Sequence, residues 1–424
     1  MIFPKWLAEK PLNRVGVKIL RVGLGSVIAL RAITELPYAH YLYSIGGASI
    51  GSTSLWLGQL GLQLDHLIYS SIGAYLLLII WGLGGLGLVL GLYPRLSTLV
   101  ALLGTLLIEL RSNIADGGDN LLRILLTYML LLHPKPELAR GPSLSIFLHN
   151  LGVIAIYFQI LLLYLVSSTT KLQGDAWVHG TAVYYVSQLE SYGPPWPFAK
   201  AVFLNPWATT LATYLVVFYQ LFFAPITLIA PLPLKLAWLW MGIALHASFA
   251  VMMGLVTFSA VMVSAILFTI RDREWDILKE RAEKIRRFLL PEIWVFVDGF
   301  CPYCKRTGTW IERLDWLGLF RVKSYREDRS FEEFGLEFDE VDKEMHIVVI
   351  KRGKYKVYKG SQALLEISKY IPFLWPLLPV LGLLNGLGLG PRLYRWLADN
   401  RIIVPSGNMC EEGSCKVHKE VDAI

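Results

Sequence analysis

The sequence has little charge. Only 17% of its 424 residues are charged and 54% are hydrophobic, whereas about a quarter of the residues of a soluble domain are charged. This composition argues against an ordinary soluble protein and indicates that much of the chain faces something other than water. The net charge of +7 is modest, and no run of basic and aromatic residues predicts a nucleic-acid partner.

Cysteine is also scarce. The four cysteines are too few for a disulfide-stabilised scaffold, and none precedes residue 300. They form two close pairs, Cys301 with Cys304 and Cys410 with Cys415, a spacing that fits redox exchange or metal binding better than structural bridges. No cleavable secretory signal is predicted, because the basic segment at residues 1–21 leads into an apolar stretch without a small-residue cleavage site.

The charges are concentrated in the second part of the chain. Residues 1–270 hold only 14 of the 40 Lys/Arg and 9 of the 33 Asp/Glu, so a membrane domain is expected before a water-facing part. Since a crossing needs about 20 apolar residues, residues 1–270 predict an all-α polytopic helical bundle of about eight spans. These spans lie near residues 15–35, 67–91, 95–112, 119–133, 145–168, 207–231, 235–254 and 256–270. The second is rich in glycine, which predicts close helix packing.

The basic residues predict the orientation. Five of them lie before or at the start of the first span and are expected to stay in the cytoplasm: Lys5, Lys10, Arg14, Lys18 and Arg21. Eight spans then place the N-terminus and residues 271–424 on the cytoplasmic side, and the loops left outside are poor in Lys and Arg. The chain is therefore expected to be an integral protein of a bacterial plasma membrane.

A change of pattern marks a second domain. Residues 271–290 combine charged and apolar residues at helical spacing and predict an amphipathic linker helix that ends before Pro291. From residue 292 the chain has a short β-rich run, a Cys-x-x-Cys that opens a helix, and further strands with a hairpin around Arg352 and Gly353. This order predicts a small α/β domain of thioredoxin type over residues 291–405, followed by a cysteine-containing tail at 406–424.

Residues 371–390 are apolar enough to suggest a ninth span. Pro372, Pro376 and Pro379, with the glycine-rich end, disfavour a regular spanning helix. We therefore expect a membrane-surface or domain-packing segment. A ninth span would move the tail to the other side of the membrane.

A Cys-x-x-Cys at the start of a helix suits thiol–disulfide exchange. The free N–H groups and the helix dipole stabilise a thiolate over a thiol, so Cys301 is the expected attacking thiol and Cys304, one turn on, the resolving one. Pro302 fits the first helical turn, where its missing N–H costs nothing. The expected partner is a thiol or disulfide of a protein or peptide.

The stretch DGFCPYC at residues 298–304 resembles the Asp-x-x-Cys-x-x-Cys signature of the DCC family of thiol–disulfide oxidoreductases. The stretch YRWLADNRIIV at 394–404 is similar to that family's closing segment, so the resemblance covers roughly residues 292–405. It adds Asp298 to the candidate site and implies redox activity for this domain.

The second cysteine pair leaves alternatives open. Cys410 and Cys415 lie in a short polar tail, where a mobile dithiol could pass electrons to the first pair as a built-in shuttle or could be incidental. The two pairs with His418 could instead form a zinc site. Redox chemistry is favoured because the first motif opens a helix after a strand, and no metal is predicted.

Ionisable residues in or beside the spans are expensive and mark function or pairing. Arg31 and Glu35 lie one helical turn apart and are expected to pair. Lys171 directly follows the fifth span. At a partly dry boundary it could act as a base, and the alternative is an interfacial lysine whose charge reaches the surface.

Several segments of residues 15–270 together resemble the HTTM domain, among them KLQGDAWVHGTAVYYVSQL at 171–189 and ALHASFAVMMGLVTFSAVMVSAILF at 244–268. That family includes vitamin K-dependent γ-glutamyl carboxylase and bacterial relatives, one of which is required to mature a peptide toxin. By the resemblance, Lys171 deprotonates a reduced quinone in an outward-opening pocket. The supporting residues that it implies are Asp119, Asn120, Asp175, Trp177 and His246.

Two departures weaken carboxylation. Ala176 separates Asp175 from Trp177, unlike the family spacing, and the chain passes from residue 270 directly to the thiol domain instead of the carboxylase's large extracytoplasmic domain. Three functions follow for the whole protein. The favoured one is a membrane thiol–disulfide oxidoreductase, coupled to a quinone-like ligand. The others are a peptide-modifying or toxin-maturation enzyme that uses Lys171 as base, and a non-catalytic maturation or immunity factor.

Overall fold

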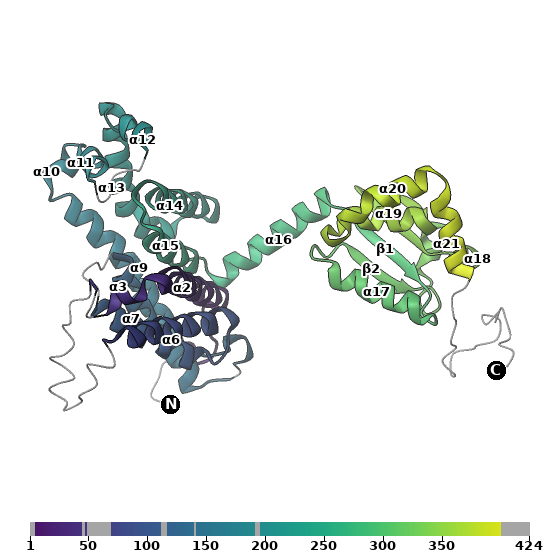
Figure 1. Cartoon of the computed structure of the whole chain (residues 1–424), viewed down its shortest axis with the longest axis horizontal. Coiled ribbons are helices and arrows are strands. Elements are labelled where there is room, and N and C mark those ends of the chain that lie inside the picture. The colour runs from purple at the N-terminus through teal and green to yellow at the C-terminus, as the bar shows by residue number, and fades with distance from the viewer. Residues whose placement is uncertain are drawn as a thin grey trace. The chain divides into compact units, whose positions relative to one another are not determined.

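The chain forms two compact units, Met1–Ile277 and Leu278–Ile424 (Figure 1). The computed structural model describes residues 5–44, 47–48, 69–111, 117–139, 141–190 and 196–399. The first unit is helical and the second contains a small sheet. The boundary between the units falls inside α16 (Asp272–Leu289), which covers the linker helix expected over 271–290.

The first unit contains a helix at each of the eight predicted span positions. These helices are α2 (Arg14–Glu35), α6 (Ser71–Leu90), α7 (Pro94–Glu109), α8 (Gly117–Met129), α9 (Leu144–Lys171), α13 (Pro206–Ile229), α14 (Leu232–Met253) and α15 (Val256–Phe268). Shorter helices connect them: α1 (Lys5–Ala8), η1 (Leu36–Tyr38), α3 (Ala39–Tyr43), η2 (Pro136–Leu138), α10 (Asp175–Val178), α11 (Ala182–Gln188) and α12 (Pro197–Val202).

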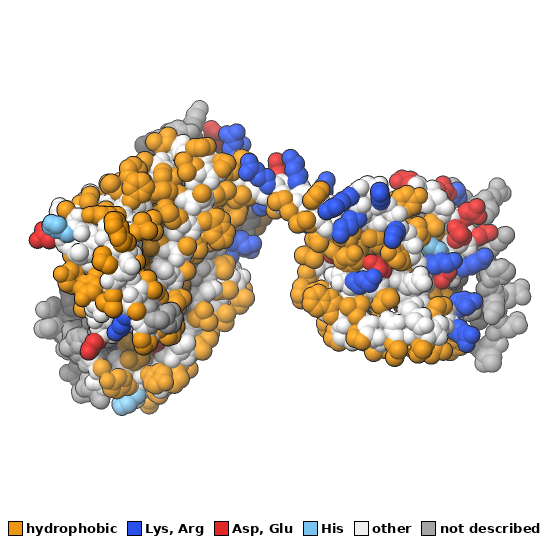
Figure 2. Space-filling model, turned by 90° about the horizontal axis from the view of Figure 1, so that it is seen from above, with side chains coloured by type: hydrophobic (Ala, Val, Ile, Leu, Met, Phe, Trp, Pro, Cys, Tyr) orange, Lys and Arg blue, Asp and Glu red, His pale blue; other side chains and the backbone are white. Residues whose placement is uncertain are grey.

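Within the described residues, four of these helices are long and apolar enough to cross a membrane: α6, α9, α13 and α14. The helices α8 and α15 have 13 residues each, about 20 Å at 1.5 Å per residue, which is less than the hydrocarbon thickness of about 30 Å. Hydrophobic side chains cover much of the face of this unit that Figure 2 shows, whereas Lys and Arg gather along α16. The four helices fit an integral membrane protein, and eight spans stay a prediction.

Glycines let α2 and α6 approach closely. A Cβ on Gly85 would lie 2.8 Å from the carbonyl oxygen of Gly25, and one on Gly25 would lie 2.6 Å from the carbonyl oxygen of Gly85. Neither position accepts a larger residue without moving backbone. This contact explains the glycines of the second predicted span as a helix-packing device.

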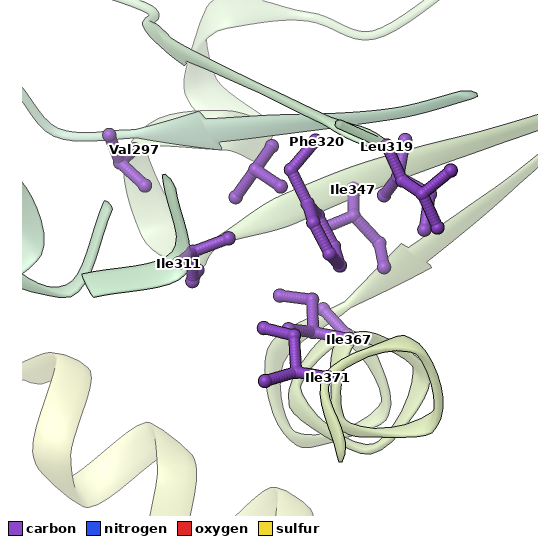
Figure 3. Packing of buried hydrophobic residues seen from close by; sticks show 10 residues of the cluster. Val297, Ile311, Leu319, Phe320, Ile347, Ile367 and Ile371 are labelled. Carbon is purple, nitrogen blue, oxygen red and sulfur yellow. The ribbon is translucent and has the colours of Figure 1, made fainter. Parts of the chain in front are cut away.

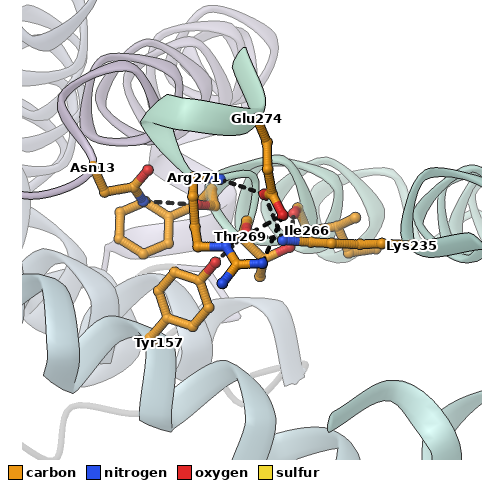
Figure 4. A network of polar contacts seen from close by, with 8 residues as sticks. Asn13, Tyr157, Lys235, Ile266, Thr269, Arg271 and Glu274 are labelled. Atoms are coloured by element: carbon orange, nitrogen blue, oxygen red, sulfur yellow. Dashed lines mark hydrogen bonds and ion pairs between the residues drawn. The ribbon is translucent and has the colours of Figure 1, made fainter. Parts of the chain in front are cut away.

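The carboxyl end of α15 is held by side chains from three other helices or their flanks (Figure 4). The Asn13 Nδ2 donates to the Phe268 carbonyl at 2.8 Å, and the Lys235 Nζ donates to the Thr269 carbonyl at 2.9 Å. The Tyr157 hydroxyl also donates to the Thr269 carbonyl. The last carbonyls of a helix have no partner within that helix, so these donors stabilise the point where the bundle gives way to α16.

The same lysine ties α16 to the bundle. The Lys235 ammonium is 1% exposed and lies 2.7 Å from the Glu274 Oε2 in the first turn of α16. The Arg271 guanidinium contacts the other carboxylate oxygen at 2.8 Å. Burial opposes ionisation of Glu274, but hydrogen bonds from Arg271 and Lys235 lower its pKa. The start of α16 is thus fixed to the membrane unit.

The second unit is built on a four-stranded sheet with the order β2-β1-β3-β4, counted over the described residues. β1 (Glu292–Val297) pairs parallel with β2 (Phe320–Ser324) and antiparallel with β3 (His346–Lys351), which pairs antiparallel with β4 (Lys354–Lys359). The turn between β3 and β4 has positive φ at Arg352 and Gly353, as a two-residue hairpin requires. The predicted hairpin is confirmed.

Helices cover both faces of the sheet. The remaining elements are α17 (Pro302–Leu314), η3 (Ser330–Phe334), α18 (Phe338–Lys343), α19 (Gly360–Tyr370), η4 (Pro372–Leu377), α20 (Leu378–Gly386) and α21 (Leu389–Asp399). Because side chains alternate along a strand, Ile293, Val295 and Val297 of β1 face one way, into a core shared with α17 and α19 (Figure 3). Phe296 faces the other way, toward η3 and α18.

Replacing Lys235 by Met should destabilise the membrane unit by about 3 kcal/mol, because the change removes one member of a buried ion pair. Thermal unfolding of the whole chain in detergent measures the effect as a lower Tm. Lys279 is an exposed lysine on α16, so Lys279→Met is the matched control and should unfold like the wild type. Equal Tm values for both variants would contradict the anchoring role of Lys235.

Candidate active site

Cys301 and Cys304 lie where the chain passes from β1 into α17. Cys301 is the N-cap residue of α17 and Pro302 is its first residue. The Cys301 Sγ accepts a hydrogen bond from the Cys304 backbone N–H at 3.5 Å. A sulfur atom in this position accepts from one of the N–H groups that lack a partner within the helix.

The two thiols differ in accessibility. Cys301 is 0% exposed, whereas Cys304 is partly exposed and lines a cavity. The order predicted from the sequence has Cys301 attacking first. The Cys301 sulfur thus accepts a hydrogen bond at the helix N-terminus but is buried, whereas Cys304 can be reached from the cavity.

Asp298 fixes the loop that carries Cys301. The side chain of Asp298 is buried, and its Oδ1 accepts a hydrogen bond from the Phe300 backbone N–H at 2.9 Å. The Arg326 guanidinium forms a two-pronged pair with the same carboxylate, Nε to Oδ1 at 2.7 Å and Nη2 to Oδ2 at 2.9 Å. Burial opposes ionisation of Asp298, but hydrogen bonds from Arg326 and Phe300 lower its pKa.

The loop also lies close to β2. A Cβ on Gly299 would lie 2.9 Å from the Ser324 Cβ, so the residue after Asp298 must be glycine for this approach. Arg326 follows β2 and lies with its guanidinium carbon 5.3 Å from the Phe300 ring centroid. Its Nη2 also contacts Asp342 at 2.7 Å. Ion pair, stacking and close approach together hold the loop in one position.

A cavity of about 490 Å³ lies beside Cys304. Its walls come from the end of β1, from α17, from Met345 before β3, and from α21. From α21 it receives Tyr394, Trp396 and Ala398. The Tyr394 hydroxyl accepts a hydrogen bond from the Met345 backbone N–H at 3.0 Å, which attaches α21 to the domain. The cavity is mostly apolar and aromatic, and its size suits part of a partner molecule next to a sulfur atom.

The candidate residues of the membrane unit have contacts of their own. Lys171 ends α9, where its Nζ donates to the Ser167 Oγ at 2.6 Å and lies 5.1 Å from the Trp177 ring centroid. Asp175 is the exposed first residue of α10. These contacts join Lys171 and Trp177 and are those of an interfacial lysine.

Asp119 is buried in the first turn of α8 and forms an ion pair with Arg31 of α2. Arg31 also pairs with Glu35 at 2.5 Å, as their spacing predicts. Asn120 is exposed and accepts from Arg123 at 2.8 Å. These contacts are those of packing ion pairs between helices, the interpretation that the sequence favours for this region.

His246 is buried in α14 and lies 3.0 Å from the Tyr164 hydroxyl of α9. Lys171, Asp119 and His246 thus each contact different neighbours. Among the described residues, no group of three or more His, Cys, Asp or Glu side chains could hold a metal ion. Cys410, Cys415 and His418 lie outside the described residues.

Sequence reasoning missed Arg326 and the contribution of α21. Arg326 lies two residues after the end of β2, which is parallel to β1. A charged residue just beyond the carboxyl end of a neighbouring strand is a usable signal for a site residue. Tyr394 and Trp396 are separated from Cys304 by about ninety residues. The stretch at 394–404 resembles the family's closing segment, but that resemblance does not place these side chains beside Cys304.

Asp298→Asn should destabilise the C-terminal unit by about 3 kcal/mol, because it leaves the buried Arg326 charge without its main partner. The exposed Glu312 of α17 provides the control, Glu312→Gln. Hydrogen exchange of the β1 amides in the full chain reports the stability of this unit alone. Unchanged exchange in the Asp298 variant would contradict the role of the ion pair.

The pH dependence of the same exchange is a second test. Because folding lowers the pKa of Asp298, its contribution to stability is present above the unfolded value of about 4 and is lost as the pH falls through the folded value. Protection of β1 in the wild type should therefore weaken in acid, and Asp298→Asn should remove part of that dependence. Identical acid profiles would contradict a folded-state pKa below the ordinary range.

Comparison with known proteins identifies the second unit. Residues 295–405 match the family model of the DCC1-like thiol-disulfide oxidoreductase. The uncharacterized protein YitO of Bacillus subtilis (strain 168) is 30% identical over 129 residues, which is 28% of this chain and 38% of YitO. The chain thus spans less than two fifths of this relative, and no solved structure was found to match. The C-terminal unit therefore contains a DCC1-like thiol-disulfide oxidoreductase domain.

Proposed function

We propose that this chain is an integral membrane thiol–disulfide oxidoreductase in which Cys301 and Cys304 exchange two electrons with a partner. The observation that carries the proposal is the Cys301 sulfur at the N-terminus of α17, hydrogen-bonded to the Cys304 N–H, within a segment that matches such a family. The parallel pairing of β1 with β2 and the antiparallel pairing of β1 with β3 and of β3 with β4 fit the expected thioredoxin-type sheet and support the same chemistry.

The exchange has two steps. A thiolate of the pair attacks one sulfur of the partner disulfide, so that a mixed disulfide forms and the other partner sulfur leaves as a thiolate. The second cysteine then attacks the first, forms the Cys301–Cys304 disulfide and releases the second partner sulfur as a thiolate. The partner gains two electrons and the pair loses two. A dithiol reductant returns the pair to its starting state.

Accessibility favours Cys304 as the sulfur that meets the partner, because it lines the cavity while Cys301 is buried. Cys301 would then complete the exchange, since its sulfur lies at the N-terminus of α17 and accepts from the Cys304 N–H. The order predicted from the sequence, with Cys301 attacking, is the alternative and requires its sulfur to become exposed. Both orders give the same products.

The proposal extends to the cell and to the rest of the chain. A cytoplasmic C-terminal unit would be kept reduced, which suits a reductase better than an oxidase. The tail pair Cys410 and Cys415 would pass electrons to Cys301 and Cys304. Coupling to a quinone-like ligand in an HTTM-type pocket, with Lys171 as base, rests on the resemblance alone. The peptide-modifying enzyme and the non-catalytic factor are alternatives that likewise rest on the sequence alone.

Replacing either cysteine of the pair should abolish catalysis. In the full chain, Cys301→Ser and Cys304→Ser should each reduce the thiol-driven reduction of insulin disulfides to the uncatalysed rate, because one sulfur cannot complete the exchange. Cys410→Ser with Cys415→Ser is the matched control and should retain insulin reduction, since the assay supplies its own reductant. Wild-type rates for either variant of the pair would refute the proposed function.

Trapping distinguishes the order of attack. A single remaining thiol forms a mixed disulfide that has no resolving partner. With the tail cysteines replaced, Cys301→Ser should accumulate a mixed disulfide with an aromatic disulfide reagent on Cys304, and Cys304→Ser should accumulate far less on Cys301. Peptide mass spectrometry locates the adduct. The opposite distribution would restore Cys301 as the attacking thiol.

A further inference from the structure

The C-terminal unit carries a large apolar surface on its last elements. We call η4, α20 and α21 together the apolar hairpin. Residues 371–390 contain no charged side chain. Large apolar side chains of this stretch are 46–70% exposed: Phe373, Trp375, Leu377, Val380, Leu383, Leu387 and Leu389. An apolar patch of this kind on a soluble surface marks an interaction site.

The polar side-chain groups of residues 371–390 are turned inward. Asn385 is the one polar amide in residues 371–390. Its Oδ1 accepts from the Ser361 hydroxyl of α19 at 2.7 Å, and its Nδ2 donates to the Leu381 carbonyl at 2.8 Å. The Trp375 Nε1 donates to the Lys369 carbonyl at 3.2 Å. The side of α20 opposite Asn385 therefore presents apolar side chains without polar groups.

The hairpin is too short and too bent for a straight crossing. α20 has nine residues, about 14 Å of helix, whereas the hydrocarbon layer is about 30 Å thick. The segments Pro372–Gly386 and Leu389–Trp396 meet at an angle of 100°. α21 adds exposed Arg392 and Arg395 beside the exposed Trp396. Basic and aromatic side chains next to an apolar face are typical of elements that lie in the membrane interface.

A bilayer fits this surface better than a soluble protein does. A protein interface carries about one hydrogen bond per 100–200 Å² and a polar rim, and the outer side of α20 offers no side chain for such bonds. The unit is also covalently linked through α16 to a unit with four membrane-crossing candidates, so lipid is always within reach.

We infer that the apolar hairpin lies in the lipid interface and that the cavity beside Cys304 takes its disulfide partner from the membrane surface. The link between the two parts is α21, which packs with α20 against α19 (Figure 1) and supplies Tyr394 and Trp396 to the cavity wall. The partner class is a disulfide on a membrane-anchored protein or apolar molecule. This second part rests on the proposed function, whereas the docking does not.

Fluorescence tests the docking without any enzymatic readout. An environment-sensitive fluorescent amino acid is placed at Leu383 in the full chain, reconstituted in phosphatidylcholine–phosphatidylglycerol nanodiscs. Its emission should be quenched by spin-labelled lipid and protected from aqueous iodide. The same probe at the exposed Lys356 of β4 is the control and should show the reverse. Iodide quenching at Leu383 equal to that at Lys356 would overturn the docking.

A surface variant tests the source of the partner. Leu383→Glu with Leu387→Glu changes two side chains that are 64% and 63% exposed, so the fold should persist. Reduction of a lipid-anchored disulfide should fall about tenfold relative to wild type as the docked position of the cavity at the membrane surface is lost, while reduction of a water-soluble disulfide stays unchanged. An equal effect on both substrates, or on neither, would overturn membrane-surface delivery. Wild-type protein that reduces neither would refute the proposed function and leave the quenching result to decide the docking.

Discussion

The hydrogen bond from the Cys304 N–H to the Cys301 sulfur is the interaction on which the chemistry of the site depends. A helix begins with N–H groups that lack partners within the helix, and here a sulfur atom occupies the place where an oxygen usually caps them. The position of the sulfur is fixed by the preceding loop, because the Asp298 carboxylate accepts hydrogen bonds from the Phe300 N–H and from the Arg326 guanidinium. A buried carboxylate in the cavity wall thus determines where the sulfur lies.

A comparable constraint operates where α15 gives way to the linker helix α16. The last carbonyls of α15 have no partner within that helix, and Asn13, Tyr157 and Lys235 supply donors to them. Lys235 also neutralises Glu274 of α16. A break between membrane bundle and linker would therefore expose unpaired carbonyls and two buried charges, which explains why the first turn of α16 belongs to the first unit.

Much of this architecture could be predicted from the sequence because local signals were strong. The Cys-x-x-Cys after a β-rich run, the proline at the start of α17 and the Arg352–Gly353 turn are short-range patterns with a direct physical meaning. The eight helices follow from apolar runs, but whether α8 and α15 cross a membrane depends on neighbours and lipid, and composition does not determine that. Arg326 and the aromatic residues of α21 reach the site through long-range packing, which leaves no periodic trace in the sequence.

The central claim is that Cys301 and Cys304 form one redox pair. The most direct test is to equilibrate the full chain, with Cys410 and Cys415 replaced by serine, against graded ratios of reduced and oxidised glutathione and to quantify its thiols by mass spectrometry. The account predicts a single two-electron transition between the dithiol and an intramolecular disulfide. Two thiols that accumulate separate glutathione adducts, without an intramolecular disulfide at any ratio, would contradict it.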